Sequence, residues 1–505
     1  MKRFPLFLTM ILLFVSVVHG QDYEPYFEEI DCPFPEDSID VSCGVLVVPE
    51  DRSDPNSEEV ELVVAIIPAA NGNPLPDPVI YLEGGPGGSA LFAVEDFQRH
   101  PLRQDRDLIL IDQRGTGFSY PSLNCYEAED PEFSSDPDQA CYERLLDEGI
   151  NLSAYTSAAS AADINDLRIA LGYDVVNLWG ISYGTRLALT ILRDYPEGVR
   201  SVVIDSVYPP EINSIEQGTE DALRAFNEIF IQCAADADCA DAYPTLEDDF
   251  YSMIASFNEN PPVFEYDDGE ETYELELYGD DVLDALFQTL YDSRVIPMLP
   301  YGITLLANAQ DDFDYQDGYD IVSGYWTAEA WDAGFTEGGE ESIFESDMVL
   351  DYMDEVGGID DSEGMYNSVE CGEEVHFNDL DAALGVVNSA PAELQEWLQA
   401  SAEGLFFSCS TWAVDESSAI ENERVISDVP VLLVSGQFDP VTPPYYAESA
   451  LQGLSNGQHV VFPTGGHGET GSAGCGGDIA HAFFANPMQP VDTSCVPQFV
   501  EWYIE

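Results

Sequence analysis

Lysine is almost absent from this chain. The 505 residues include 15 Lys+Arg against 97 Asp+Glu, the single lysine is Lys2, and the formal net charge is -82. Such a field repels nucleic acid and anionic membranes and attracts cations, so we expect no nucleic-acid partner. Because the acidic residues are spread along the whole chain, we interpret them as an adaptation to salty water, where screening weakens self-repulsion.

Long apolar runs are also missing. After the N-terminus, no stretch approaches the ~18 uninterrupted apolar residues of a membrane-spanning helix. The N-terminus has two early cations, a short apolar run, and small residues at Val18 and Gly20, which is the pattern of a secretory signal peptide. The residue directly after Gly20 is not a cysteine, so a lipoprotein anchor is not indicated. We expect an extracellular or periplasmic protein without membrane contact once the signal peptide is cleaved.

The cysteines show no C-x-x-C spacing. An even count of ten in an exported chain favours disulfides over metal ligands, so we expect no metal site. Other pairings stay open at this point, but the simplest connectivity joins consecutive cysteines. Those pairs are Cys32–Cys43, Cys125–Cys141, Cys233–Cys239, Cys371–Cys409 and Cys475–Cys495.

Strand and helix patterns alternate in the first part of the chain. Apolar runs such as VIYL and DLILI end in glycine-rich turns, and segments with helical spacing follow them. This alternation predicts an α/β protein with a doubly wound, mostly parallel sheet. From about residue 208 the sequence becomes helical, aromatic and acidic, and strand patterns return only near residue 429.

One sheet domain with a helical insertion explains this order. The insertion would be a cap over the carboxyl ends of the strands, where open α/β sheets bind their ligands. The predicted organisation is a signal peptide (1–20), a first core part (21–207), a helical cap (208–415) and a C-terminal core part (416–505).

The stretch GISYGT places Ser182 between two glycines, where a strand pattern changes to a helix pattern. A serine hydroxyl is a weak nucleophile unless it is accessible and a base takes its proton. A sharp strand-turn-helix elbow exposes the hydroxyl, and Gly180 and Gly184 leave room for the tight crossing. The helix N-terminus also stabilises a developing negative charge. Ser182 is therefore the candidate nucleophile.

An orienting acid and then a histidine should follow such a nucleophile along the chain. Asp439 follows the returning strand, in GQFDPVTPP, and His467 follows the next strand, in TGGHG. Among the six histidines, His467 has the expected strand-then-glycine setting, so we predict it to be the general base. Asp205, at the end of SVVID, is a rival for the acid. We favour Asp439 because it follows the insertion.

A glycine-rich loop supplies candidate donors for an oxyanion hole. EGGPGG follows the strand VIYL, and the N–H of Gly85 would join the N–H of Tyr183 in holding the tetrahedral oxygen. The alternative is a phosphate-binding loop. It is disfavoured because neither G-x-G-x-x-G nor G-K-[ST] spacing is present. We expect no cofactor.

Five motifs in order, LEGGPGGS, DQRGTGFS, GISYGT, GQFDPVTP and GGHG, resemble the secreted tripeptidyl and prolyl aminopeptidase branch of the α/β-hydrolases. The segment around Cys409 and Trp412 is similar to the C-terminal region of that family. The resemblance implies an α/β-hydrolase fold and a secreted serine exopeptidase acting on peptides with a free N-terminus. Glu83 departs from the family pattern, because prolyl aminopeptidases usually carry histidine there. This departure favours the tripeptidyl aminopeptidase side.

An exopeptidase must bind the cationic α-amino group of its substrate, and a desolvated carboxylate is the natural counter-charge. Glu373 and Glu374, in SVECGEEVHF, are the candidates. The resemblance points to the same region, because related aminopeptidases anchor the amine with acids from the cap. Against this stands the composition: with 97 acidic residues, such a pair is more often solvated surface.

Other functions are compatible with the same residues. A carboxylesterase or lipase uses the same triad, since fold does not determine substrate. A catalytically silent binding protein is less favoured because all three triad residues are present. Ser182 itself disfavours a dehalogenase or epoxide hydrolase, which use an aspartate nucleophile.

Overall fold

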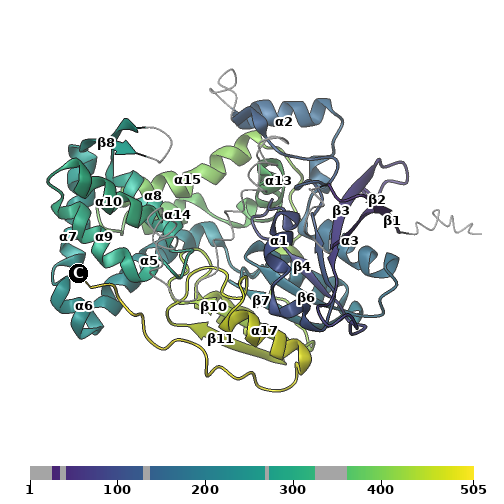
Figure 1. Ribbon diagram of the computed structural model, residues 1–505. Helices are drawn as coiled ribbons and strands as arrows, with labels where there is room; N and C mark the ends of the chain where they lie inside the picture. Colours follow the sequence, from purple (N-terminus) through teal and green to yellow (C-terminus); the bar gives the residue numbers. More distant parts are fainter. Residues whose placement is uncertain (1–24, 34–40, 129–136, 268–271, 325–360, 505) are drawn as a thin grey trace, which may run out of the picture.

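The computed structural model describes residues 25–33, 41–128, 137–267, 272–324 and 361–504 (Figure 1). The predicted signal peptide, residues 1–20, lies outside these ranges. Among the helices they contain, none has the length and apolar character needed to cross a bilayer.

A nine-stranded sheet is built from two parts of the chain, before and after the helical insertion. Its order is β1-β2-β3-β5-β4-β6-β7-β10-β11, and every pair from β5 onward in this order is parallel. The predicted mostly parallel sheet is therefore confirmed, with antiparallel pairing confined to the β1, β2 and β3 edge. The strands are β1 (Tyr26–Ile30), β2 (Ser42–Pro49), β3 (Glu59–Ile67), β4 (Val79–Leu82), β5 (Leu108–Ile111), β6 (Val176–Ile181), β7 (Val199–Asp205), β10 (Val431–Gly436) and β11 (Gly457–Phe462).

Helices cover both faces of this sheet because its strands are apolar on both sides. Successive residues of a strand point to opposite faces, and Leu178 and Trp179 of β6 accordingly belong to two different core clusters. One face packs against α3, α4 and α16, and the other against α1 and α17. The helices of this part are α1 (Val94–Phe97), α2 (Pro137–Asp147), α3 (Ser157–Ala170), α4 (Tyr183–Asp194), α16 (Pro444–Leu451) and α17 (Cys475–Ala485).

A second, mainly helical part lies between β7 and β10 in the chain and beside the sheet in space (Figure 1). It has its own apolar core, to which Phe226, Phe250 and Leu283 contribute. It also contains a short antiparallel hairpin that the sequence patterns did not predict. Its elements are α5 (Ser214–Ala235), α6 (Ala237–Ala242), α7 (Leu246–Glu259), β8 (Val263–Asp267), β9 (Thr272–Glu276), α8 (Gly279–Thr289), α9 (Leu299–Asn308), α10 (Asp312–Ser323), α13 (Glu363–Glu373), α14 (Leu380–Val387) and α15 (Gln395–Thr411).

The C-terminal segment after α17 returns to the helical part, along the lower edge of Figure 1. The backbone N–H of Tyr503 donates to the carbonyl of Pro297 at 3.0 Å. The hydroxyl of Tyr243 donates to the carbonyl of Tyr503 at 2.9 Å, and Val500 is buried in the helical core. The end of the chain thus ties the helical part to the sheet.

Five disulfides join the ten cysteines in consecutive order, which is the simplest of the connectivities considered above. Four of them close local loops of 6 to 20 residues, and Cys371–Cys409 spans 38 residues between α13 and α15.

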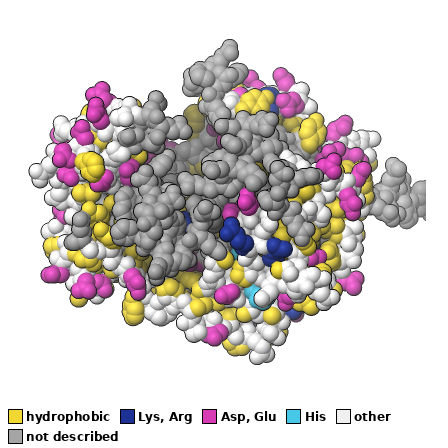
Figure 2. Space-filling model, viewed as in Figure 1, with side chains coloured by type: hydrophobic (Ala, Val, Ile, Leu, Met, Phe, Trp, Pro, Cys, Tyr) yellow, Lys and Arg dark blue, Asp and Glu magenta, His cyan; other side chains and the backbone are white. Residues whose placement is uncertain are grey.

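Figure 2 shows acidic side chains over both the helical part and the sheet part of the visible face.

Candidate active site

Ser182 occupies the turn between β6 and α4. Its backbone has φ 55 and ψ -125, a conformation that costs free energy for a residue other than glycine. The flanking glycines allow this turn: a Cβ on Gly180 would lie 2.3 Å from the carbonyl oxygen of Gly184, and one on Gly184 would lie 2.0 Å from that of Leu82. Among the described residues, the Ser182 hydroxyl has no hydrogen-bond partner. The turn therefore presents a free hydroxyl.

His467 and Asp439 are paired at the ends of neighbouring strands. Asp439 follows β10, His467 follows β11, and Nδ1 of His467 lies 2.9 Å from Oδ2 of Asp439. The other carboxylate oxygen, Oδ1, accepts the backbone N–H groups of Val441 and Thr442 at 3.0 and 2.8 Å, while the Thr442 hydroxyl donates to Oδ2 at 2.6 Å. Both carboxylate oxygens of Asp439 thus accept hydrogen bonds.

The two side chains shift each other's protonation. Burial raises the pKa of Asp439, but the neighbouring His467 and the hydrogen bonds outweigh it and hold this pKa at about 2. Burial lowers the pKa of His467, yet the charge of Asp439 and its hydrogen bond outweigh burial and raise that pKa above 6.5. A permanently ionised acid thus orients a histidine that can take up a proton.

Asp205, the rival for the acid, has a different partner. Its Oδ2 accepts the backbone N–H of Thr470 and, at 2.7 Å, the Thr470 hydroxyl. Its carbonyl accepts the backbone N–H of Ser182 at 3.0 Å. Asp205 therefore bonds the Ser182 turn and the loop after His467. Nδ1 of His467 contacts Asp439 instead.

The loop from Gly84 to Gly88 passes over Ser182. A Cβ on Gly84 would lie 3.0 Å from the Cβ of Ser182 and 3.5 Å from its hydroxyl oxygen. Gly85 has φ 101, and its N–H has no hydrogen-bond partner among the described residues. Tyr183 is the first residue of α4, where a backbone N–H lacks an acceptor inside the helix. Among the described residues, two backbone donors without an acceptor thus lie next to groups that touch or adjoin the serine, one after Gly84 and one after Ser182 itself.

Glu83 fixes the start of this loop. Its Oε1 accepts the N–H of Gly84 at 2.7 Å, and its Oε2 accepts the hydroxyl of Tyr81 at 3.0 Å. Burial raises the pKa of Glu83 to about 7, although both hydrogen bonds lower it. The residue that departs from the prolyl aminopeptidase pattern thus holds the backbone beside the candidate oxyanion hole.

Glu373 and Glu374, predicted to bind a substrate amine, face an arginine of the protein itself. Both side chains are 1% exposed and point at Arg186 of α4, with Nη1 of Arg186 3.0 Å from Oε2 of Glu374. The other oxygen of Glu374 accepts the backbone N–H and hydroxyl of Ser214 at 2.8 and 3.0 Å. Oε1 of Glu373 accepts the backbone N–H of Ser157 at 2.6 Å. These contacts join helices within the protein, while Oε2 of Glu373 has no hydrogen-bond partner among the described residues. The amine-binding role of the pair stays a prediction.

Glu370, one turn earlier on α13, was missed by the sequence analysis. It is buried, and its carboxylate has no hydrogen-bond partner among the described residues. Burial and the neighbouring Glu374 raise its pKa to about 8, despite the opposing charge of Arg186. Its position four residues before Glu374, on the same side of a helix, was the available signal.

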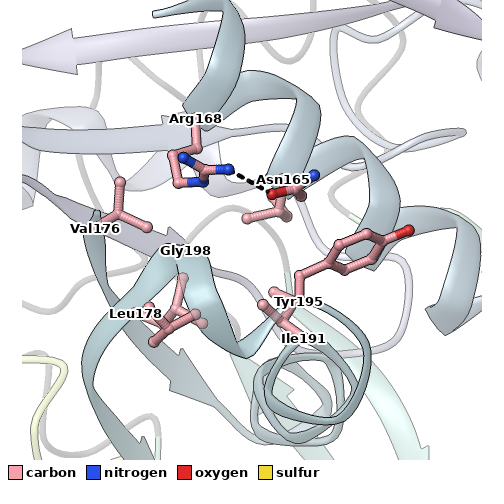
Figure 3. A pocket seen from close by; sticks show the side chains of 9 residues that line it. Asn165, Arg168, Val176, Leu178, Ile191, Tyr195 and Gly198 are labelled. Carbon is pink, nitrogen blue, oxygen red and sulfur yellow. Dashed lines mark hydrogen bonds between the residues drawn. The ribbon is translucent and has the colours of Figure 1, made fainter. Parts of the chain in front are cut away.

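A small cavity lies elsewhere, between α3, β6 and α4 (Figure 3). Val176, Leu178 and Ile191 line it, and Nη2 of Arg168 donates to Oδ1 of Asn165 at 2.9 Å beside it. Val176 begins β6, whereas Ser182 follows its last residue. The cavity is therefore at the opposite end of the strand from the candidate site.

Two family models match the chain. The α/β hydrolase fold model matches residues 77–241, which include Ser182, and a model described as TAP-like protein matches residues 396–495, which include Asp439 and His467. The solved structure of a proline iminopeptidase from Mycobacterium smegmatis is also similar, at 14% identity and a TM-score of 0.38, covering 88% of this chain and 93% of that one.

Several relatives carry the names of peptidases. The serine protease Hip1 of Mycobacterium tuberculosis is 25% identical over 462 residues, covering 83% of this chain and 80% of Hip1. The tripeptidyl aminopeptidase of Streptomyces lividans is 29% identical over 226 residues, 39% of this chain and 40% of that enzyme. The proline iminopeptidase of Xylella fastidiosa is 31% identical over 137 residues, 27% of this chain and 34% of that enzyme.

Proposed function

Because this chain is a serine hydrolase of the α/β-hydrolase fold with a TAP-like C-terminal region, we propose that it is a secreted exopeptidase that cleaves peptides near a free N-terminus. The observation that carries the proposal is the 2.9 Å contact between His467 and Asp439, in a fold that also holds Ser182 in a strained turn. The peptidase names of the relatives support the substrate class.

In the proposed mechanism, the Ser182 oxygen attacks the scissile carbonyl while Nε2 of His467 takes its proton. Asp439 stabilises the imidazolium that forms. The N–H groups of Gly85 and Tyr183 stabilise the tetrahedral oxygen, because both are unused donors beside the serine. His467 then returns the proton to the leaving amine. A water molecule hydrolyses the acyl-enzyme by the same steps in reverse.

The buried acidic cluster on α13 supports recognition of a substrate amine. Glu373 and Glu374 pair with the guanidinium of Arg186, and the buried Glu370 lies close enough to feel its charge, so carboxylates outnumber cations there. Burial and the neighbouring Glu374 raise the pKa of Glu370 to about 8, so its carboxyl takes up a proton near neutral pH, and an ammonium group would replace that proton. The cluster adjoins the candidate site through Ser157. The backbone N–H of Ser157 donates to Glu373 at 2.6 Å, and its hydroxyl lies 2.8 Å from the hydroxyl of Tyr183.

A panel of peptide arylamides with free and acetylated N-termini, and a p-nitrophenyl ester, tests the proposal. Parent enzyme should cleave the free peptides and lose turnover or gain a much higher KM on the acetylated ones. Ser182→Ala and His467→Ala should each lower kcat by about 10⁴ to 10⁶ while remaining folded. Activity of either variant above a tenth of the parent's would exclude the triad.

Glu370→Gln tests amine recognition separately. We expect weaker hydrolysis of free peptides by ~2 kcal/mol or more in kcat/KM, the scale for removing one member of a buried charge pair. Hydrolysis of the ester should be unchanged, because the ester carries no amine. Glu396→Gln, an exposed glutamate on α15, is the matched control. Equal rates on free and acetylated peptides would instead favour an esterase or an endopeptidase.

A further inference from the structure

A short segment of the helical part, Leu290–Ser293, lies directly on the loop that carries His467. The backbone N–H of His467 donates to the carbonyl of Tyr291 at 3.0 Å. The N–H of the preceding Gly466 donates to the Ser293 hydroxyl at 2.9 Å, and this hydroxyl donates to Glu469. The histidine loop is thus bonded to residues about 175 positions earlier in the chain.

The side chain of Tyr291 also contacts the imidazole itself. The two ring centroids are 4.6 Å apart with an interplanar angle of 46°, and the exposed fraction of the His467 side chain is 8%. Asp439 binds one nitrogen of the imidazole, while the tyrosine ring packs on it from the helical part. Together these contacts restrict rotation of the imidazole about its Cβ–Cγ bond.

Both sides of this contact are firmly held. Leu290 and Val295, which flank the segment, are buried in the core of the helical part. On the other side, Gly468 N–H donates to the Ser206 hydroxyl at 2.9 Å, just after β7. The histidine loop is therefore clamped between the sheet and the helical part.

Gly466 makes this close approach possible. A Cβ at this position would lie 2.5 Å from the carbonyl oxygen of Leu290 and 2.7 Å from that of Tyr291. A side chain there would separate the two backbones. The glycine before the histidine thus serves the contact with the helical part.

We propose that Tyr291 is a positioning residue for His467, so that the catalytic geometry forms only while the helical part is docked on the histidine loop. This inference rests on the proposed function in one respect, the role of His467 as general base. Tyr291 does not touch the reacting atoms. It acts by holding the imidazole in the plane in which Nδ1 bonds Asp439, and therefore by aiming Nε2 at the serine.

The test compares Tyr291→Ala, Tyr291→Phe and Tyr315→Ala. A small ester such as p-nitrophenyl acetate is the substrate, because it needs no amine recognition. Tyr315 is the matched control: it packs on Phe264 at 5.3 Å in the core of the helical part, away from the histidine loop. Rates of Ser182 labelling by a fluorophosphonate probe give a second readout, and circular dichroism melts verify folding.

We expect Tyr291→Ala to lower kcat and the labelling rate by tenfold or more with KM changed less than twofold, since a misplacement of about 1 Å can cost 10²-fold in rate. Tyr291→Phe should recover most of this loss because it keeps the ring. Tyr315→Ala should behave like the parent. A Tyr291→Ala variant with kcat within twofold of the parent would overturn the inference, and so would an equal loss in Tyr315→Ala.

Ser293→Ala decides the matter if Tyr291→Ala does not fold. It removes the hydroxyl that bonds Gly466 and Glu469 but leaves the packing of the segment intact. It should lower kcat with little change in KM, and an unchanged kcat would count against the inference. Failure of the proposed function has a different signature, namely ester hydrolysis and labelling that persist in Ser182→Ala.

Discussion

Arg186 and Glu374 form a buried ion pair, with Nη1 3.0 Å from Oε2 and exposed fractions of 2% and 1%. Arg186 lies on α4, one turn after the Ser182 elbow, and Glu374 is the residue that follows α13. The pair therefore joins the helix behind the nucleophile to a helix from the other part of the molecule.

Removing Glu374 should destabilise the protein. Glu374→Ala leaves the Arg186 charge with one carboxylate fewer in a buried site, a change that typically costs 3 to 5 kcal/mol of unfolding free energy. Urea denaturation measures this loss of unfolding free energy. Arg424→Gln is the control, because Arg424 forms a pair with Glu211 that is 37% exposed on the arginine side, and such pairs contribute about 0 to 1 kcal/mol. Equal stability of Glu374→Ala and the parent would contradict the role of the pair.

The pH profile should report His467. A general base acts in its neutral form, and the pKa of His467 is raised above 6.5, so kcat/KM should fall on the acid side with a midpoint above pH 6.5. In Asp439→Asn, burial is no longer opposed by the carboxylate, and the midpoint of the residual activity should move to lower pH. An uncharged ester is the substrate, so that Glu370 does not contribute.

Burial raises the pKa of both Glu83 and Glu469 to about 7, and Glu83→Gln removes the first of these groups. The pKa of Glu83 is about 7, and the residue holds the loop over Ser182. If the acid limb belongs to His467, it persists in Glu83→Gln. Its disappearance in that variant, or a parental midpoint at or below 6.5, would disagree with the prediction.

The bond between Cys371 and Cys409 should stabilise the packing of α13 against α15. It closes a loop of 38 residues, and the chain-entropy model gives about 4 kcal/mol for a loop of this length. The double variant Cys371→Ser, Cys409→Ser should lose a comparable amount in urea denaturation, and proteolysis should cut first between these helices. Removing Cys233–Cys239, which spans 6 residues, should cost less. The opposite order would argue against the loop-length explanation.

Salt should stabilise this protein strongly. With a formal net charge of -82, the folded chain repels itself at low ionic strength, and the screening length falls from about 30 Å at 0.01 M to about 3 Å at 1 M salt. Tm measured by calorimetry should therefore rise steeply with NaCl. Sucrose, which does not screen charge, should give a smaller increase. A Tm independent of NaCl would refute the interpretation of the charge as a salt adaptation.

Local signals in the sequence were sufficient for the sheet and for the placing of Ser182. Alternating apolar strands and helices predicted the mostly parallel sheet because periodicity depends on near neighbours in the chain. Gly180 predicted the tight elbow for the same reason, since the backbone that it approaches is that of Gly184, whereas Gly184 itself approaches Leu82 of a distant strand.

Contacts between distant segments were decided by the tertiary structure. Asp205 ends β7 and Asp439 follows β10, the neighbouring parallel strand, and only the fold shows that His467 bonds Asp439 while Asp205 bonds Thr470. Glu373 and Glu374 looked available because a run of acids carries no sign of the arginine that faces it, and Arg186 lies nearly 190 residues earlier. Tyr291 had no local signal at all. Its contact with His467 exists because the helical part packs against the sheet part there. That packing depends on shape and burial over the whole interface rather than on any short stretch of sequence.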